Sequence, residues 1–201
     1  MDREIGEMRR VLERQFKATI TDWPELIKLF SCEALEAGAH WIRAGQRRDV
    51  FFYIAQGLLR IYYIDQNGKE LNEGFYDERM MLGPVASFVS DAPCPFYIQA
   101  LEPTTLWVAS YPRFHTFAMD KPDILNFEIT FMQNLFYSNA KRDAKRLLSS
   151  GEQRYRWFCR EYGHLLERLP QYQIASFLGM TPVSLSRLRK QVQISSASRI
   201  P

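Results

Sequence analysis

The segment that decides the fold is residues 169–190, with the sequence LPQYQIASFLGMTPVSLSRLRK. Ala175 is small at a position where two helices would have to cross closely. Gly179 can adopt the left-handed conformation that ends a helix. Thr181 is a good N-cap, and Pro182 suits the first position of the helix that follows it. Together these features predict a helix–turn–helix.

The second helix of this motif has two chemically different faces. At 100° per residue, Leu185, Leu188 and Val192 fall on one apolar face, which we expect to pack inward. The opposite face carries short, polar and basic side chains, as a helix that enters the major groove of DNA must. We therefore predict a set of DNA-binding residues: Thr181, Pro182, Val183, Ser184, Ser186, Arg187, Arg189 and Lys190.

The charge distribution supports a polyanionic partner for the C-terminal part of the chain. The formal net charge of the whole chain is only +3. Residues 141–201 hold 12 basic and 4 acidic residues, whereas residues 1–140 carry a net charge of −5. A basic region beside an acidic one suggests binding to nucleic acid. A solvated basic face is the alternative, and charge by itself does not separate the two.

Between residues 34 and 110 the pattern changes to short β-rich runs that are separated by turn residues. The clearest unit pairs residues 58–64 with residues 69–76, through a tight turn in which Asn67-Gly68 supplies the positive-φ positions. Short strands at roughly regular spacing predict a small antiparallel barrel or roll. The expected strands are residues 40–42, 50–55, 58–64, 71–76, 96–101 and 105–109.

Helical periodicity marks the segments on either side of this β region. Residues 2–18 and 23–30 predict two helices before it, and the helical period returns from Pro122. The later helix has a stripe with the spacing of a coiled-coil seam, formed by Leu125, Ile129, Met132 and Phe136. A second stripe on the adjoining face consists of Ile124, Phe127, Phe131 and Leu135.

Two apolar stripes on one helix need two partners. We predict that one stripe covers the β region and that the seam pairs with the same helix of a second copy of the chain. The alternative is a single broad apolar face inside the core of one monomer.

Several classes of protein are disfavoured by what the sequence lacks. No apolar run approaches the ~18 residues of a membrane span, and the charged N-terminus lacks the apolar stretch of a secretory signal, so we expect a cytoplasmic protein. Cys32, Cys94 and Cys159 are widely scattered, which predicts neither a disulfide framework nor a metal cluster. The chain has no glycine-rich phosphate loop, GxSxG or HExxH motif, so we expect neither an enzyme nor a bound cofactor.

The order of these parts resembles a known superfamily. A β-roll, a long helix and a C-terminal helix–turn–helix are similar to the regulators related to the cyclic-AMP receptor protein and the fumarate–nitrate regulator (Crp/Fnr), from about Trp23 to Lys190. The stretches that carry the resemblance are residues 51–60 (FFYIAQGLLR) and residues 174–189.

The resemblance implies an α+β fold in three parts. Residues 1–120 would hold N-terminal helices and a cyclic-nucleotide-binding-like antiparallel β-roll (jelly-roll), residues 121–147 the dimerisation helix, and residues 148–201 a winged-helix-like helix–turn–helix domain. Few residues follow Lys190, and residues 195–198 are typical of a frayed tail, so we expect a shortened wing.

The resemblance also implies a function. In this family the roll is a sensor, and the helix–turn–helix domains of the two subunits bind a palindromic promoter site. The expected partners are therefore double-stranded DNA and a second copy of the chain, with RNA polymerase as a further candidate and a small-molecule effector that the sequence does not identify. The family's base-contacting positions fall at Pro182, Val183 and Arg187, of which only Arg187 keeps a polar group.

The sensor cassette departs from the family's pattern. Members that bind cyclic nucleotides carry Gly-Glu, whose Glu meets the ribose, and then Arg-Ser/Thr-Ala, whose Arg meets the cyclic phosphate. Here Pro84 stands where Glu would be, and Cys94 replaces the Arg. A buried phosphate would then lack a charge partner, so we predict no specific binding of cyclic AMP. The degenerate ligand pocket comprises Gly83, Pro84, Val85, Ala86, Ser87, Cys94, Pro95 and Phe96.

The sequence is also compatible with one function other than DNA binding. A cyclic-nucleotide-binding-like domain can act as an interaction module that regulates a partner protein without touching DNA. The interaction-module hypothesis leaves the basic face of the last helix unexplained. A test of duplex DNA binding at low salt distinguishes the two hypotheses.

Overall fold

The computed structural model describes residues 2–83 and 92–197, with side chains up to Gln191. These residues group into two compact units. The first, here called the roll unit, holds Met1–Tyr63 and Gly74–Tyr137. The second, the helical unit, holds Ile64–Glu73 and Ser138–Pro201, so the tip of one β-hairpin groups with the C-terminal helices. The three-part division at residues 120 and 147 stays a prediction.

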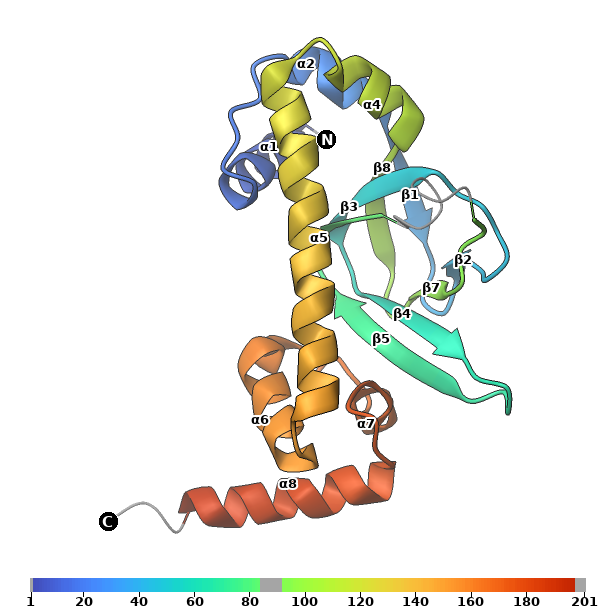
Figure 1. Cartoon of the computed structure of the whole chain (residues 1–201), viewed down its shortest axis with the longest axis vertical. Helices are drawn as coiled ribbons and strands as arrows, with labels where there is room; N and C mark the ends of the chain where they lie inside the picture. Colours follow the sequence, from blue (N-terminus) through green and yellow to red (C-terminus); the bar gives the residue numbers. More distant parts are fainter. Residues whose placement is uncertain (1, 84–91, 198–201) are drawn as a thin grey trace. The chain divides into compact units, whose positions relative to one another are not determined.

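Two four-stranded sheets form the roll (Figure 1). The first has the order β1-β8-β3-β6, with β1 (Phe30–Leu35), β8 (Thr104–Ser110), β3 (Val50–Gln56) and β6 (Met81–Leu82). The second has the order β2-β7-β4-β5, with β2 (His40–Ile42), β7 (Tyr97–Ala100), β4 (Leu59–Ile64) and β5 (Glu70–Tyr76). The described strand pairings are antiparallel, which confirms the predicted roll.

The central strand β3 is apolar on both faces because each face meets a different core. Phe52 and Ile54 lie in the core between the two sheets, together with Val108 of β8. Phe51 and Tyr53 alternate with them and point into a core shared with helices. A strand that is buried on both sides shows a continuous apolar run instead of alternation, which explains the sequence VFFYIA at the start of β3.

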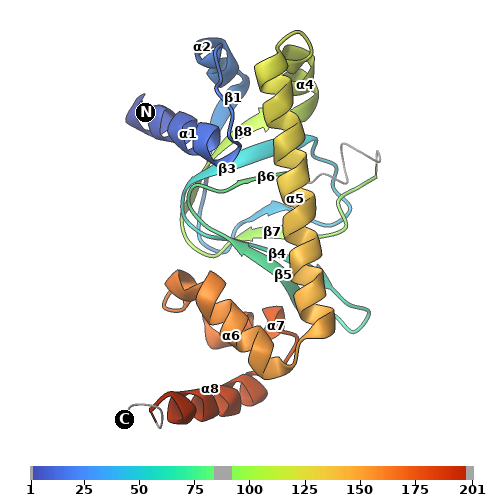
Figure 2. The same cartoon turned by 60° about the vertical axis from the view of Figure 1, so that its left-hand side comes forward.

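Four helices enclose the second core of the roll unit. They are α1 (Asp2–Gln15), α2 (Trp23–Leu26), α4 (Tyr111–Ala118) and the first part of α5 (Pro122–Leu148). Figure 2 shows α1 beside β3. The ring of Phe16, just after α1, meets Phe127 of α5 edge to face, with 4.9 Å between their centroids. Apolar packing therefore joins the N-terminal segment to α5.

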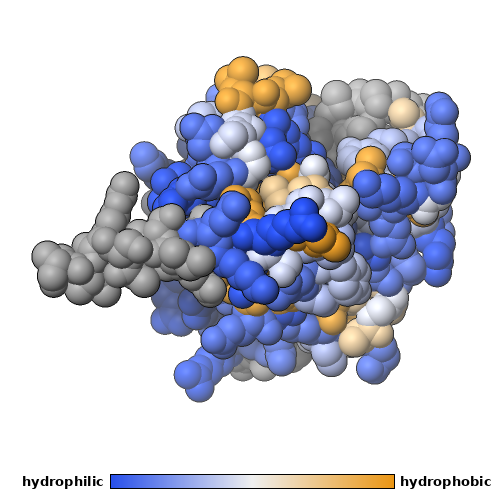
Figure 3. All heavy atoms as spheres, turned by 90° about the horizontal axis from the view of Figure 1, so that it is seen from below, coloured by the Kyte–Doolittle hydropathy of each residue, from blue (hydrophilic) through white to orange (hydrophobic). Residues whose placement is uncertain are grey.

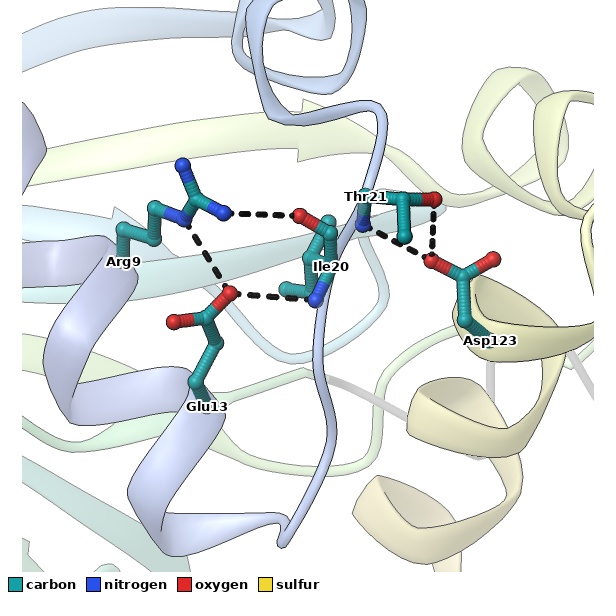
Figure 4. Close-up of polar contacts among 5 residues, drawn as sticks. All are labelled: Arg9, Glu13, Ile20, Thr21 and Asp123. Carbon is teal, nitrogen blue, oxygen red and sulfur yellow. Dashed lines mark hydrogen bonds and ion pairs between the residues drawn. The ribbon is translucent and has the colours of Figure 1, made fainter.

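Hydrogen bonds fix the segment between α1 and α2 to side chains of α1 and α5 (Figure 4). Glu13 accepts a hydrogen bond from the backbone N–H of Ile20, and Arg9 donates to the Ile20 carbonyl, each at 3.0 Å. The backbone and hydroxyl of Thr21 both donate to Asp123 Oδ2 on α5, at 2.9 and 2.8 Å. These contacts, led by the Thr21 backbone N–H, hold the pKa of Asp123 below its ordinary value.

The helical unit packs its helices around an aromatic core. Its helices are the end of α5, α6 (Gly151–Glu161), the short 3-10 helix η2 (Gly163–Leu165), α7 (Gln171–Phe177) and α8 (Pro182–Ala197). Phe158 and Trp157 of α6 are buried and pack against Phe177 of α7. A reciprocal pair of hydrogen bonds between Ser150 and Gln153 caps the start of α6.

Several expected elements differ in the structure. The helix predicted over residues 2–18 ends at Gln15, and the one predicted over 23–30 is a single α-turn followed by the 3-10 helix η1 (Ile27–Leu29). Phe30, which was expected to end this helix, instead begins β1, where it pairs with Ala109 of β8. The sequence did not predict β1, β6 or α4. The helix α8 continues through residues 195–197, where a frayed tail was expected.

The turn of the β4–β5 hairpin also differs from the prediction. Only Gly68 of the Asn67-Gly68 pair has a positive φ, at +78°. Asp65 bridges the loop, because its Oδ1 accepts hydrogen bonds from the backbone N–H groups of Asn67 and Lys69, each at 2.9 Å. The connection is therefore a longer loop that is stabilised by an aspartate, and not a two-residue turn.

Candidate nucleic-acid interface

The turn between α7 and α8 has the geometry that its sequence predicts. Gly179 has a φ of +66°, and the N–H of Met180 bonds back to the carbonyl of Ala175 at 3.0 Å. The backbone N–H of Ser184 donates to Thr181 Oγ1 at 3.1 Å, so Thr181 caps α8. Ala175 is fully buried. The predicted helix–turn–helix is confirmed.

The outward face of α8 is exposed as predicted. Leu185 is buried, whereas Val183 is 60% exposed and Arg187 and Lys190 are exposed. Thr181, Pro182 and Ser184 are also exposed at the start of the helix, and Ser186 is half-buried. Seen from below, the surface is mostly hydrophilic (Figure 3). The first turns of α8 thus present short side chains, followed by two cations.

Arg189 lies differently from the other predicted DNA-binding residues. It is half-buried and hydrogen-bonds Tyr155 of α6. Burial raises the pKa of Tyr155, as does its hydrogen bond with Cys159, whereas the charge of Arg189 acts in the opposite direction. Arg189 therefore contacts Tyr155 within the helical unit, whereas the side chain of Lys190 is exposed and better placed to reach a phosphate.

A polar clamp, which no pattern in the sequence indicates, holds α7. Asn72 of β5 is buried, and its amide donates to the backbone carbonyl and to Oε1 of the buried Gln173, at 3.0 and 2.5 Å. Its backbone N–H donates to Ser176 Oγ at 3.0 Å, and that hydroxyl donates to the carbonyl of Glu70 at 3.0 Å. The first helix of the motif is therefore held to the hairpin tip by several directional bonds.

Two arginines of α5 extend this clamp. Arg142 is buried and donates from Nε and Nη2 to Glu73 Oε1, at 2.9 and 2.5 Å. Arg146 donates to the backbone carbonyls of Asn72 and Glu73, at 2.7 and 3.0 Å. No local signal marks these partners, because the residues that meet lie far apart in the chain.

The sensor cassette is described only in part. Pro84, Val85, Ala86 and Ser87 lie outside the described residues. Gly83 and Phe96 are half-buried, and Pro95 is exposed. Cys94 is buried in the core between the two sheets, where burial raises the pKa of its thiol. The position at which the resemblance expects an arginine thus holds a small buried thiol and no cation.

The two apolar stripes of α5 lie largely apart, except that Met132 of the seam packs, partly buried, against the same core as the second stripe. Ile124, Phe127 and Phe131 are buried in the second core of the roll unit, with Leu135 partly buried against it. On the seam, Ile129 is 49% and Phe136 78% exposed, and Leu125 and Met132 are half-buried. The seam is therefore a partly exposed apolar face, and its pairing with a second copy stays a prediction.

Metal-binding clusters and membrane-spanning helices are absent from the part of the chain that the structure describes. Within residues 2–83 and 92–197, no group of three or more His, Cys, Asp or Glu side chains is arranged to hold a metal ion. In the same ranges, none of the helices combines the length and the apolar character that a membrane crossing requires.

Comparisons with known proteins agree with this architecture. Residues 32–121 match the family model of the cyclic nucleotide-binding domain. No curated protein matches the sequence as a relative. The solved structures that resemble the chain include CLP from Xanthomonas campestris, described as a c-di-GMP responsive global regulator, with 14% identity, a TM-score of 0.66 and coverage of 86% of this chain and 91% of CLP.

Two further structures show the same likeness. FixK2 from Bradyrhizobium japonicum has 12% identity and a TM-score of 0.67, with coverage of 83% of this chain and 86% of FixK2. CooA from Carboxydothermus hydrogenoformans has 16% identity and a TM-score of 0.66, with coverage of 90% and 88%. The predicted fold, a cyclic-nucleotide-binding-like β-roll with flanking helices, a long helix and a C-terminal helix–turn–helix, is therefore confirmed.

Proposed function

We propose that this chain, which has the fold of Crp/Fnr regulators, is a DNA-binding transcription regulator that acts as a homodimer. The observation that carries the proposal is the exposed outer face of α8, with Arg187 and Lys190 free of acidic partners among the described residues. A helix that is capped at Thr181 and anchored by the buried Leu185 presents this face rigidly. RNA polymerase is a candidate partner of such a regulator.

Each exposed residue of α8 has a distinct proposed role. Arg187 binds a guanine edge, because a guanidinium can donate to both O6 and N7. Val183, which is 60% exposed, makes an apolar contact such as one with a thymine methyl group. Lys190 binds a backbone phosphate, which adds affinity without sequence preference.

The roll is proposed to act without cyclic AMP. The cassette lacks the Glu and Arg that meet the nucleotide, because Pro84 and Cys94 stand in their places. The space between the two sheets is occupied by packed side chains, among them Trp41 and Phe52, whose ring centroids are 4.5 Å apart. A calorimetric titration of the full chain with cyclic AMP is expected to show no binding, and a micromolar dissociation constant would overturn this part.

A mobility-shift experiment tests the proposed roles of Arg187 and Lys190 in DNA binding. On an operator selected from random duplexes, Arg187→Ala is expected to weaken binding by about 1–3 kcal/mol per half-site and to relax preference at one base pair. Lys190→Ala, the matched control, is expected to weaken all sequences equally and to lower the salt slope by about one unit.

Two outcomes contradict the proposal at different levels. Unchanged affinity and preference for Arg187→Ala would show that α8 does not enter the groove in this orientation. Failure of the wild-type chain to bind any duplex at low salt would favour the interaction module that regulates a partner protein.

Sedimentation tests the proposed dimer. Ile129→Asp places a charge on the exposed seam of α5, and we expect it to shift the protein from dimer to monomer, because burying an unpaired carboxylate at the interface is unfavourable. Asn134→Asp is the control, since the exposed Asn134 lies 140° away around the helix at 100° per residue. A wild-type protein that sediments as a monomer at micromolar concentration would refute the dimer.

A further inference from the structure

A shallow hollow in the helical unit has an unusual set of lining residues. It lies between the end of α5, α6 and α7, and it encloses an empty volume of about 200 Å³, including the solvent at its mouth. All of its charged lining residues are cations, and two aromatic rings complete it: Arg142, Lys145, Arg146, Arg154, Trp157 and Phe177. A site of this composition offers donors and no acceptor.

The cations of the hollow are only partly neutralised. Arg142 pairs with the carboxylate of Glu73. Arg146 and Arg154 donate instead to backbone carbonyls, Arg154 to those of Leu178 and Ser149 at 2.9 and 2.7 Å. Carbonyl oxygens accept hydrogen bonds but carry no net charge. The ammonium of Lys145 has no hydrogen bond or ion pair with any described residue. Arg142 therefore pairs with a carboxylate, whereas Arg146 and Arg154 bond to uncharged carbonyl oxygens.

A buried donor without an acceptor points to the same conclusion. Trp157 is only 6% exposed, and its indole Nε1–H has no hydrogen-bond partner among the described residues. Its ring is fixed in place, because it stacks on Phe177 with 5.9 Å between centroids and 17° between planes. Buried donors are almost always paired in native proteins, so an unpaired donor on a residue that lines the hollow is unusual.

We propose that this hollow binds the phosphoryl group of a small ligand. Guanidinium groups bind phosphate oxygens through charge-assisted hydrogen bonds, and the ammonium of Lys145 adds a further charged donor. The hollow is narrow, so we expect the phosphoryl group to bind at its mouth, where solvent is present.

A small ligand fits these observations better than a duplex does. Arg142 is 8% exposed and Trp157 6%, and both lie between helices, where the phosphate of a rigid double helix cannot follow. The cations suited to a duplex, Arg187 and Lys190, are exposed on α8. The site does not depend on the proposed reading of DNA, and either can fail without the other.

The indole N–H resonances of the full-length protein provide a direct test. The chain has four tryptophans, and the resonance that disappears in Trp157→Phe identifies Trp157. Inorganic phosphate and adenosine 5′-monophosphate are titrated separately, with chloride at equal ionic strength as the reference. We expect the Trp157 resonance to shift saturably with at least one of the two phosphates and not with chloride.

Two variants of α5 separate the site from general charge. Lys145→Gln is expected to weaken the phosphate titration roughly tenfold, because it removes a charged donor from the hollow. Lys141→Gln removes the same charge from the same helix, but Lys141 pairs with Glu161 and does not line the hollow, so it should leave the titration unchanged.

Comparing the two titrations shows whether the hollow binds free phosphate or only the phosphate of a nucleotide. A response to inorganic phosphate and to the nucleotide alike supports a phosphoryl site, and a response to the nucleotide alone supports a nucleotide phosphate. A shift that only duplex DNA produces, an equal loss in Lys141→Gln, or no saturable shift with either phosphate would overturn the proposal.

Discussion

Each of the two units is stabilised internally by a different kind of interaction. The core between the two sheets of the roll unit is almost entirely apolar, with Trp41, Phe52 and Ile98 among its members. In the helical unit, residues 70–73 meet α5 and α7 through buried amides, an arginine and a carboxylate. Apolar packing is strong but has little directional preference, whereas buried hydrogen bonds fix geometry and are costly to leave unpaired.

This difference suggests a division of labour. A well-packed apolar core gives the roll its stability. A polar clamp gives α7 a defined position, because the Asn72 amide bonds to Gln173 through two directional hydrogen bonds. The position of α7 in turn sets that of α8, since Gly179 and Thr181 join the two helices by a short turn.

The largest effect is expected in the roll. Phe52→Ala removes a fully buried ring from the core between the sheets, and we expect a loss of about 3–5 kcal/mol in the free energy of unfolding. Urea denaturation measures it, and hydrogen exchange should show faster opening of β3 and β8. Phe52→Leu, which keeps most of the volume, is the control and should lose much less. Equal losses for both variants would contradict the packing account.

A smaller and more localised effect is expected at the clamp. Asn72→Ala leaves the Gln173 side chain and a backbone carbonyl without their donor, which should cost about 1–3 kcal/mol. Hydrogen exchange is expected to speed up in α7 and to stay unchanged in β3 and β8. The exposed Asn67 of the same hairpin supplies the control variant Asn67→Ala. Uniformly faster exchange across both units would mean that the clamp is not local.

The smallest effect is expected where a polar contact is open to water. Asp123 accepts two hydrogen bonds from Thr21 in the roll unit, and these lower its pKa. The stabilisation by the charged form is present above the ordinary carboxyl pKa and is lost as the pH falls through the lower folded-state value. Because solvent screens the contact, Asp123→Asn should cost less than about 1 kcal/mol at neutral pH.

Acid titration of stability checks this last expectation. The difference between wild type and Asp123→Asn should disappear at low pH, while Asp120→Asn, at an exposed neighbouring acid, should change nothing at any pH. A difference that stays constant down to the lowest pH would show that the carboxylate charge is not what stabilises the contact.

Much of the architecture was predictable because its signals are local. Gly179 and Thr181 act within one turn of the chain, and the period of apolar residues distinguishes the strands from α5. The elements that were missed have weak local signals: β6 has two residues, Met81 and Leu82, and exists because it pairs with β3. The exposed polar face of α8 was predicted, but the contact of Arg189 with Tyr155 was not.

The sequence by itself determined where the helices cap, where the strands alternate and which face of α8 is polar, since each depends on neighbours within a few residues. Only the tertiary structure decided what Asn72, Glu73 and Trp157 contact. Asn72 and Gln173 lie 101 positions apart, and no periodicity links residues at that separation. Whether a buried polar group finds its partner is settled by how distant segments fold together, and this is why the clamp and the cationic hollow became visible only in three dimensions.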